Sequence, residues 1–485
     1  MNVKLNDSAD CSELGDLLAQ LAEGLDDYLT FTDEDAMLKS ESWRTALGQP
    51  LPEAGAGIQQ LLAEIREHLL PNASPVPKPG FSAFITTGAS SAAILAALSA
   101  HVAAPQRFGL NAFNYLENLS LEWLAELLEL APTMQGVYCS GGSIANIVAM
   151  GAARQAAFER LGVDPARDGI SSPCRVFASA AAHRTIHRAA AVLGMGRASV
   201  VPIAVDASGR MRPDDLLRRL AGQADSEAVN IAIVANAGST DTGAIDPLEE
   251  IGLIAKQHDI WFHVDGAYGL PGILDPVCKP LYKGMRHADS TSVDPHKWLG
   301  APVGVGATFV RDPDILQRAF TQETADYLEG SFSQDQARHS MDSFGIPYHN
   351  FGLELSAPSR GVIVWAIIRE IGRKGLAQRV IRHNAMARHI ADRATADRHL
   401  ELVLEPVLSI CCFRYHDAGI ADLNDLNRRI HRELVYRGVN MPSTTTVHDK
   451  LVIRPCFIGA RTQWAQADAL VDEVIEIGRH LSNNI

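Results

Sequence analysis

The chain has 485 residues, of which 47% are hydrophobic and 21% are charged, the composition of an ordinary globular protein. The net charge is −14, from 43 basic and 57 acidic residues, and no basic run forms a stripe, so we expect neither nucleic acid nor a membrane as partner. Seven cysteines are scattered without a CxxC spacing, which disfavours disulfides and a metal site and favours a reducing, cytoplasmic location.

The first part of the chain predicts two amphipathic helices. Leucines recur at helical spacing over 14–25, and a second apolar series occupies 58–69. The Pro-rich stretch 71–80 has the composition of a linker. We therefore expect an amino-terminal helical segment over residues 1–79.

Short apolar strands alternate with helices in residues 80–373. This alternation predicts an α/β domain with a mostly parallel sheet flanked by helices. The strand candidates are 136–140, 175–179, 230–236, 260–264, 290–293 and 306–310. Residues 374–485 mix strands, at 408–415 and 450–455, with two amphipathic helices, and predict a small α+β domain.

Two further stretches stand out from this alternation. The most apolar segment, 90–105, is too short to span a bilayer, and we expect it to be a buried helix. The polar stretch 321–347 has the composition of a lid or active-site loop. The amino terminus lacks the basic and continuously apolar segments of a signal peptide.

The stretch "CSGGSIANIVAM" (139–150) predicts an anion site. A strand ends, two glycines and a serine turn the chain, and an apolar helix begins. Amide N–H groups at such a helix start favour phosphate; Gly142 allows close approach, and Ser143 can add a hydroxyl. The spacing is neither that of a Walker A loop nor G-x-G-x-x-G. A tight turn with a serine cap is the alternative interpretation.

Two charged residues follow strand candidates further along the chain. Asp265, in "HVDGAYG", lies at the carboxyl end of a strand, where open α/β sheets bind ligands. Its carboxylate can pair with a flat cationic ring, or it is simply the N-cap of a helix. Lys297, in "STSVDPHKWLG", is a candidate nucleophile that could form a Schiff base if partly desolvated. The alternative is a lysine that reaches solvent along its aliphatic stem.

Together, an anion site, a carboxylate and an amine in this order suit pyridoxal 5′-phosphate (PLP), which has a phosphate, a ring nitrogen and an aldehyde that bonds to lysine. The chain resembles the PLP-dependent group II amino-acid decarboxylases, which act on aromatic amino acids, histidine, glutamate or cysteine sulfinate. The resemblance rests on "CSGGSIAN", "AAAHRTIHRAA", "HVDGAYG" and "DPHKW", and extends from about residue 80 to the carboxyl terminus. It implies the PLP-dependent transferase type I fold, with a seven-stranded sheet.

The resemblance also implies a role for each matching cofactor residue. Lys297 would form the Schiff base, Asp265 would pair with the ring nitrogen, and Ala267 and His183 would pack on the two ring faces. Gly142, Ser143 and His296 would hold the phosphate, and Thr240 would lie near the cofactor. His187, four residues beyond His183, is the better candidate for an ordinary surface histidine. No metal is expected.

The substrate side of the site is implied in the same way. Tyr327 aligns with a lid tyrosine that delivers a proton to the substrate carbon; an anchoring aromatic is the alternative. Arg454 matches an arginine that meets a substrate carboxylate in glutamate-type members, or it forms an ordinary ion pair. Phe84 lies in a stretch that lines the substrate pocket, although this stretch departs from the aromatic-rich version of the aromatic-acid enzymes. Asp294 replaces an asparagine found near the phosphate in some members, and we assign it no role.

The activity implied is decarboxylation of an L-amino acid to an amine and CO2, in a homodimer with the site at the subunit interface. Which amino acid is the substrate stays open. The alternatives are an aldehyde-forming oxidative outcome, a C–C lyase, a transaminase and a non-catalytic protein of the same fold. The presence of His183 and Tyr327 favours plain decarboxylation.

Overall fold

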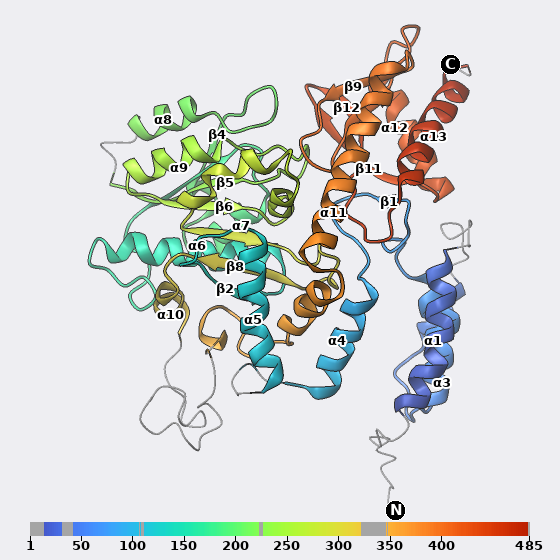
Figure 1. Ribbon diagram of the computed structural model, residues 1–485, viewed down its shortest axis with the longest axis horizontal. Coiled ribbons are helices and arrows are strands. Elements are labelled where there is room, and N and C mark those ends of the chain that lie inside the picture. Colours follow the sequence, from blue (N-terminus) through green and yellow to red (C-terminus); the bar gives the residue numbers. More distant parts are fainter. Residues whose placement is uncertain are drawn as a thin grey trace, which may run out of the picture.

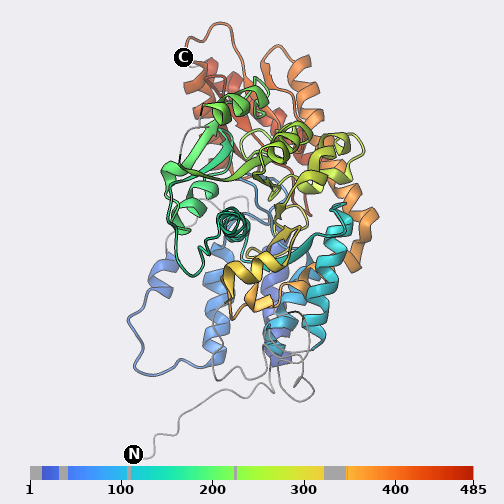
Figure 2. The ribbon, with the colours of Figure 1, turned by 90° about the vertical axis from the view of Figure 1, so that its left-hand side faces the viewer.

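The computed structural model describes residues 14–31, 42–105, 107, 111–222, 227–321, 346 and 348–483. A large α/β domain and a smaller α+β domain lie next to one another, and the amino-terminal helices lie beside them (Figure 1). Seen from the side, the carboxy-terminal elements gather at one end of the molecule and the amino-terminal helices lie toward the other (Figure 2). Within the described ranges, no helix is both long and apolar enough to cross a membrane.

The large domain is built on a seven-stranded sheet. In spatial order its strands are β2 (Gln135–Cys139), β8 (Gly306–Val310), β7 (Ser290–Val293), β6 (Trp261–Asp265), β5 (Val229–Asn236), β3 (Cys174–Ser179) and β4 (Val200–Ile203). Only β8 runs antiparallel to its neighbours, so the mostly parallel seven-stranded sheet predicted from the sequence is confirmed. The strand β4 was not predicted, because Pro202 interrupts its apolar pattern; an edge position tolerates this proline.

Helices cover both faces of this sheet, with α6 on one side and α9 on the other (Figure 1). The helices of the large domain are α5 (Ala112–Leu127), α6 (Gly142–Glu159), α7 (Thr185–Val192), α8 (Pro213–Ala221), α9 (Leu248–Gln257) and α10 (Asp314–Phe320). Shorter 3-10 segments are η4 (Arg197–Ser199), η5 (Leu270–Leu274), η6 (Lys279–His287) and η8 (Tyr348–Asn350). Every residue of β3, β6, β7 and β8 is buried, as expected for strands covered on both faces.

The register of the parallel strands brings their polar ends together. Asp265, the last residue of β6, lies opposite Asn236 at the end of β5 and opposite Ser292 in β7. The turn from β2 into α6 opens at the same edge of the sheet, because β2 runs parallel to β7 through two antiparallel pairings. This edge therefore collects the candidate residues of the sequence motifs.

The small domain has a five-stranded sheet with its own apolar core. Its strands, in spatial order, are β1 (Phe81–Ser82), β11 (Met441–Val447), β12 (Lys450–Arg454), β10 (Cys412–Tyr415) and β9 (Leu400–Leu404). The helices α12 (Leu423–Arg437) and α13 (Trp464–Ser482) pack on it. The strand β1 pairs in parallel with β11, so the chain just after the Pro-rich stretch joins the carboxy-terminal sheet.

A long helix, α11 (Gly361–Ala396), connects the two domains. It breaks at Gly372, whose φ of 64° and ψ of 178° are not helical. Residues before the break pack in the large core, and residues from Met386 onward pack in the small one. The helix therefore ties the small domain to the large one.

The apolar segment expected to be a buried helix forms α4 (Ser91–Ala103), but the expectation of burial is wrong. Only its alanines Ala93, Ala96 and Ala100 are buried, whereas Leu95 is 65% and Val102 is 62% exposed. The helix is apolar on all sides, so its sequence gave no sign of which face packs against the protein. Its larger side chains form an uncovered apolar surface.

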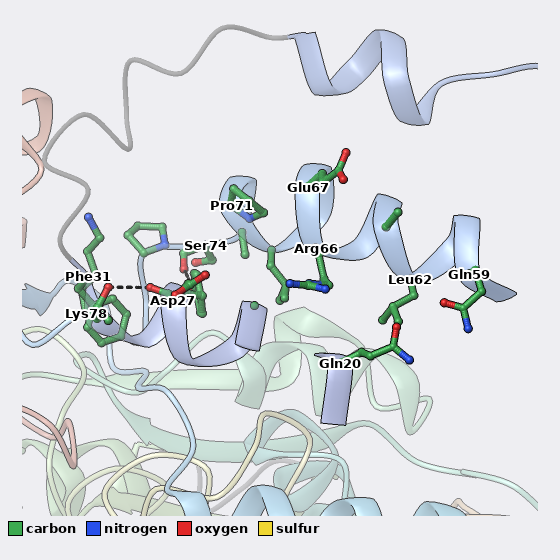
Figure 3. Close-up of a pocket in the computed structure, with 17 residues that line it drawn as sticks. Gln20, Asp27, Phe31, Gln59, Leu62, Arg66, Glu67, Pro71, Ser74 and Lys78 are labelled. Atoms are coloured by element: carbon green, nitrogen blue, oxygen red, sulfur yellow. Dashed lines mark hydrogen bonds between the residues drawn. The ribbon is translucent and has the colours of Figure 1, made fainter. Parts of the chain in front are cut away.

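The amino-terminal helices confirm the two amphipathic helices predicted there. They are α1 (Leu14–Thr30) and α3 (Ile58–Glu64), the latter continued by η2 (Ile65–Leu69) and η3 (Leu70–Asn72), with the short α2 (Ser42–Leu47) between. No residue of α1 is buried. A cavity of about 720 Å³ lies between the helices, and Figure 3 shows Leu62 and Gln20 pointing toward one another across it.

Candidate active site

A cavity of about 450 Å³ lies at the carboxyl edge of the large sheet. The turn after β2, the segment before α7, the ends of β5 and β6, and the loop after β7 all contribute to it. Nine of the residues predicted to form the site line this cavity, namely Phe84, Gly142, Ser143, His183, Thr240, Asp265, Ala267, His296 and Lys297. The fold thus gathers residues that are up to 213 positions apart in the sequence (297 − 84).

The turn between β2 and α6 forms a close cradle at one end of the cavity. Gly141 has a φ of 116°, a conformation that favours glycine, and no side chain caps the amino terminus of α6. A Cβ at position 141 would come within 3.1 Å of the His296 ring, and one at position 142 within 2.7 Å of Asp294 Oδ2. A side chain at either position would therefore displace His296 or Asp294, and the uncapped N–H groups beside Ser143 suit a phosphate.

Asp265 is buried and held by three hydrogen bonds. Oδ2 accepts from Asn146 Nδ2 at 2.9 Å, and Oδ1 accepts from Ser292 Oγ and from the Ala267 amide, each at 3.1 Å. These donors come from α6, from β7 and from the chain just beyond Asp265 itself, so the carboxylate cannot rotate without losing them. The site therefore holds a fixed carboxylate at the cavity wall.

The charge of Asp265 is stabilised despite its burial. Burial raises its pKa, but the opposing influence of His263, Lys297 and the Asn146 amide is larger, so its pKa lies below the usual value. An ionised carboxylate in this position can hold a proton on a ring nitrogen that faces it.

A hydrogen-bonded chain links Asp265 to His183, which also lines the cavity. Asn146 donates to Asp265 and to Thr185 Oγ1 (2.9 Å), and Thr185 contacts His183 Nδ1 at 3.0 Å. Asn146 Oδ1 also contacts His263 Nε2 at 3.1 Å. Burial lowers the pKa of His263 to about 4, so its imidazole is neutral at physiological pH and acts only as a hydrogen-bonding support.

His183 lies at the cavity as a neutral ring. Burial lowers its pKa, Asp265 opposes this change, and the nearby Lys297 lowers the pKa further. Its Nδ1 is fixed by Thr185, whose amide also donates to it at 3.3 Å. A neutral, oriented imidazole is well suited to lie flat against an aromatic ring.

Lys297 forms an ion pair that the sequence did not predict. Its Nζ lies 3.0 Å from Asp294 Oδ2, with 20% of the lysine side chain and 1% of the aspartate side chain exposed. Asp294 Oδ1 is buried without a hydrogen-bond partner, and His296 Nε2 lies 3.8 Å from Oδ2. Asp294, to which we assigned no role, is thus the counter-ion of the candidate nucleophile.

Two predicted site residues are placed differently from the others. Arg454 does not line the cavity; its guanidinium donates to the backbone carbonyls of Phe84 (2.6 Å), Asp241 (3.2 Å) and Thr240. Tyr327 lies outside the described residues, as does most of the polar stretch around it.

Sequence reasoning missed three residues that complete the site, Asn146, His263 and Ser292, and the role of a fourth, Asp294. Asn146 and His263 stand inside the quoted motifs, but their side-chain directions were not readable from spacing. Ser292 and Asp294 flank the end of β7, and their roles depend on which neighbours they meet across the sheet. The signal available for all four was their position within or next to a motif at a strand end.

Four features of the cavity match four parts of PLP. The glycine cradle suits the phosphate, and the fixed carboxylate suits the ring nitrogen. The neutral histidine suits a face of the ring, and the lysine suits the aldehyde. Fold and site therefore define a PLP-dependent enzyme of fold type I. The sequence profile of the pyridoxal-dependent decarboxylase conserved domain matches residues 41–416. The chain belongs to this family of PLP-dependent carboxy-lyases.

Individual relatives agree with this assignment. The chain is 28% identical over 438 residues to an aromatic-L-amino-acid decarboxylase of Bacillus atrophaeus (88% of this chain, 86% of the relative). It is 31% identical over 441 residues to an L-2,4-diaminobutyrate decarboxylase of Rhizobium meliloti strain 1021 (90% and 85%). Among solved structures, that of Oryza sativa TDC with PLP and tryptamine has a TM-score of 0.88 at 23% identity, covering 98% of this chain and 99% of that one. The structural likeness confirms the predicted fold.

Proposed function

We propose that the protein converts an L-amino acid to the corresponding amine and CO2, with PLP held by the amine of Lys297. The observation that carries this proposal is the meeting of Lys297, Asp265 and His183 in one cavity beside the glycine cradle. When bound, PLP supplies a conjugated ring that accepts the electron pair left when CO2 departs. The residues of the chain bind this ring, set its charge and control protons.

Each wall of the cavity has a separate task in this proposal. The amino terminus of α6, with Gly142 and Ser143, binds the phosphate, and His296 closes the same end. Asp265 keeps the ring nitrogen protonated, because His263, Lys297 and its hydrogen bonds hold its pKa low and the hydrogen bonds fix it in place. His183 packs on one face of the ring and Ala267 on the other. Thr240 lies beside the cofactor at the cavity wall.

Proton delivery decides between an amine and another product. In our proposal Tyr327 directs a proton to the substrate carbon after CO2 leaves, and closure of its segment excludes water and oxygen from the cavity. The amine of Lys297 would hold the cofactor between turnovers. An aldehyde-forming outcome is the alternative, and it needs oxygen to reach the same carbon.

The product balance tests this proposal. We expect purified protein supplied with PLP and a panel of amino acids to release one equivalent of CO2 for each equivalent of amine formed. Both products can be quantified together, CO2 by trapping and amine by chromatography. Formation of aldehyde with ammonia and peroxide in place of amine would contradict the proposal, and sustained turnover of a keto acid would point to a transaminase.

We also propose a homodimer, in which residues 1–79 form a dimerisation segment beside a large domain (80–373) and a small domain (374–485). Two surfaces support this proposal: the exposed Leu95 and Val102 of α4, and α1, which is amphipathic but buries none of its residues. A cavity of about 390 Å³ with an apolar lining lies between α4, α5 and α11 and extends the first surface. Exposed apolar patches of this kind mark interaction sites.

Sedimentation equilibrium tests the dimer. We expect a mass of about twice that of the chain at micromolar concentration, and a shift toward the single chain when Leu95→Asp places a charge on α4. The matched control is Leu217→Asp, at an exposed leucine of α8 on the far side of the large domain. A single-chain mass for the unmodified protein at assay concentration, with full activity, would contradict the proposal.

A further inference from the structure

Phe84 stands at the cavity in a strained conformation. Its φ of 55° lies in the left-handed region, which bulky side chains rarely adopt. Its side chain lines the cavity, yet the residue is 68% exposed, so the ring lies at the mouth and not in the core. A strained residue of this kind persists only where its surroundings fix it, and such residues collect at functional sites.

The small sheet clamps both backbone groups of Phe84. Its N–H donates to Ser443 Oγ on β11 at 2.7 Å, and its carbonyl accepts from Arg454 Nη1 on β12 at 2.6 Å. The Arg454 side chain is buried, 3% of the residue being exposed, and also donates to the carbonyls of Thr240 and Asp241. One guanidinium thereby joins the strand-end loop that carries Thr240 to the segment that carries Phe84.

The mouth of the cavity differs chemically from its floor. The floor carries the ionic and polar residues around Lys297 and Asp265, whereas Phe84 shares the lining with Ile85 and with Val303, which is 76% exposed. Among the described residues that line the cavity there is no arginine. The guanidinium of Arg454 is directed at backbone carbonyls, so it offers no ion pair at the mouth.

We propose that the substrate has a large uncharged side chain, aromatic or aliphatic, that packs on Phe84, Ile85 and Val303, and that Arg454 is a positioning residue that holds Phe84 in place. This inference rests on the proposed function, because it places the reacting carbon over Lys297 and the side chain toward the mouth. A charged side chain packed against these apolar groups would lose part of its hydration without gaining a charged partner there.

A substrate panel gives the first test. We expect kcat/KM for phenylalanine, tyrosine, tryptophan or leucine to exceed that for aspartate, glutamate, cysteine sulfinate and 2,4-diaminobutyrate by roughly 100-fold. A charged amino acid as the best substrate overturns the inference and leaves the proposed function standing. Absence of CO2 from every amino acid, by contrast, overturns the proposed function and this inference together.

Variants of Phe84 and of Arg454, which holds it, give the second test. In Phe84→Ala and Arg454→Met we expect KM for the best uncharged substrate to rise roughly tenfold while kcat changes less than about threefold. The dissociation constant of 2-phenylethylamine, followed by thermal shift of the loaded enzyme, should rise by the same factor. The visible absorbance of the bound cofactor should not change, because neither residue is assigned to the cofactor.

Two further variants distinguish a positioning role of Arg454 from a loss of folding and from direct contact between Arg454 and the substrate. Ser443→Ala removes the hydrogen bond to the Phe84 N–H without removing a charge. We expect KM to rise in this variant, but less than in Arg454→Met. Arg414→Met removes another buried arginine of the small sheet, one that pairs with Glu401, and should leave KM unchanged. If Arg454→Met lowers kcat and Phe84→Ala changes nothing, Arg454 meets a substrate carboxylate and the inference is overturned.

Discussion

Replacing Lys297 with alanine is expected to lower the release of CO2 by about 10⁴-fold or more, because the chain then has no amine to hold the cofactor. The absorbance band near the visible edge, which a lysine-bound cofactor gives, should disappear in the same variant. Absorbance and CO2 release are therefore measured on one preparation. A variant that keeps the band and the activity would show that another group holds the cofactor.

The ion pair with Asp294 determines how this experiment is controlled. Removing one partner of a buried pair leaves an uncompensated charge, which costs about 3–5 kcal/mol, so Lys297→Ala can lose activity by unfolding. Lys297→Arg keeps a cation beside Asp294 but has no nucleophilic amine, and we expect it to fold and to remain inactive. Lys283→Ala, at an exposed lysine of η6, should retain both the band and the activity.

The positions of Asp265 and Lys297 could be predicted because both follow strands of a parallel sheet. Once the alternation of strands and helices fixes such a sheet, the carboxyl ends of its strands share one edge, and residues there must be near one another. The six strand candidates of the large sheet all correspond to strands in the structure. Only β4, with its proline, fell outside this pattern.

The supporting residues could not be predicted, because their roles depend on side-chain direction. Asn146 contacts Asp265, Thr185 and His263 at once, and nothing in the spacing of "CSGGSIAN" indicates that its amide turns toward the sheet. The same holds for Asp294, to which we assigned no role from the sequence and which the structure pairs with Lys297. Burial of α4 was predicted wrongly for a related reason. The composition of a helix shows that it is apolar, but it does not show whether other parts of the chain cover it.

Asn146 also explains how two motifs distant in sequence act together. It belongs to the helix whose amino terminus suits the phosphate, and it donates a hydrogen bond to Asp265, the carboxylate that we propose pairs with the ring nitrogen. A displacement of α6 would therefore change the phosphate cradle and the orientation of Asp265 together. This coupling means that Asp265 should be tested by a substitution that leaves its hydrogen-bonding neighbours in place.

Asp265→Asn is that substitution, and we expect it to lower kcat by roughly 1,000-fold while the cofactor is still captured. An amide has nearly the shape of the carboxylate, and its oxygen can still accept from Ser292 and Ala267, whereas its NH2 group replaces the oxygen that accepts from Asn146. It carries no charge to hold a proton on the ring nitrogen. Stopped-flow measurement of single-turnover CO2 release, together with the visible absorbance of the loaded enzyme, separates slow chemistry from lost cofactor.

The control for Asp265→Asn is a second buried aspartate outside the cavity. Asp246 accepts from the Met211 amide at 2.6 Å and from the Asn236 amide at 2.7 Å, and burial raises its pKa to about 7. Because this carboxyl is partly protonated at pH 7, Asp246→Asn removes only part of a charge, and that charge lies outside the cavity, so kcat should stay within about threefold of the unmodified enzyme. Equal losses in both variants would attribute the effect to general disturbance of the sheet. If kcat falls only in Asp265→Asn and the absorbance band is retained, the carboxylate of Asp265 is the group that keeps the ring nitrogen protonated.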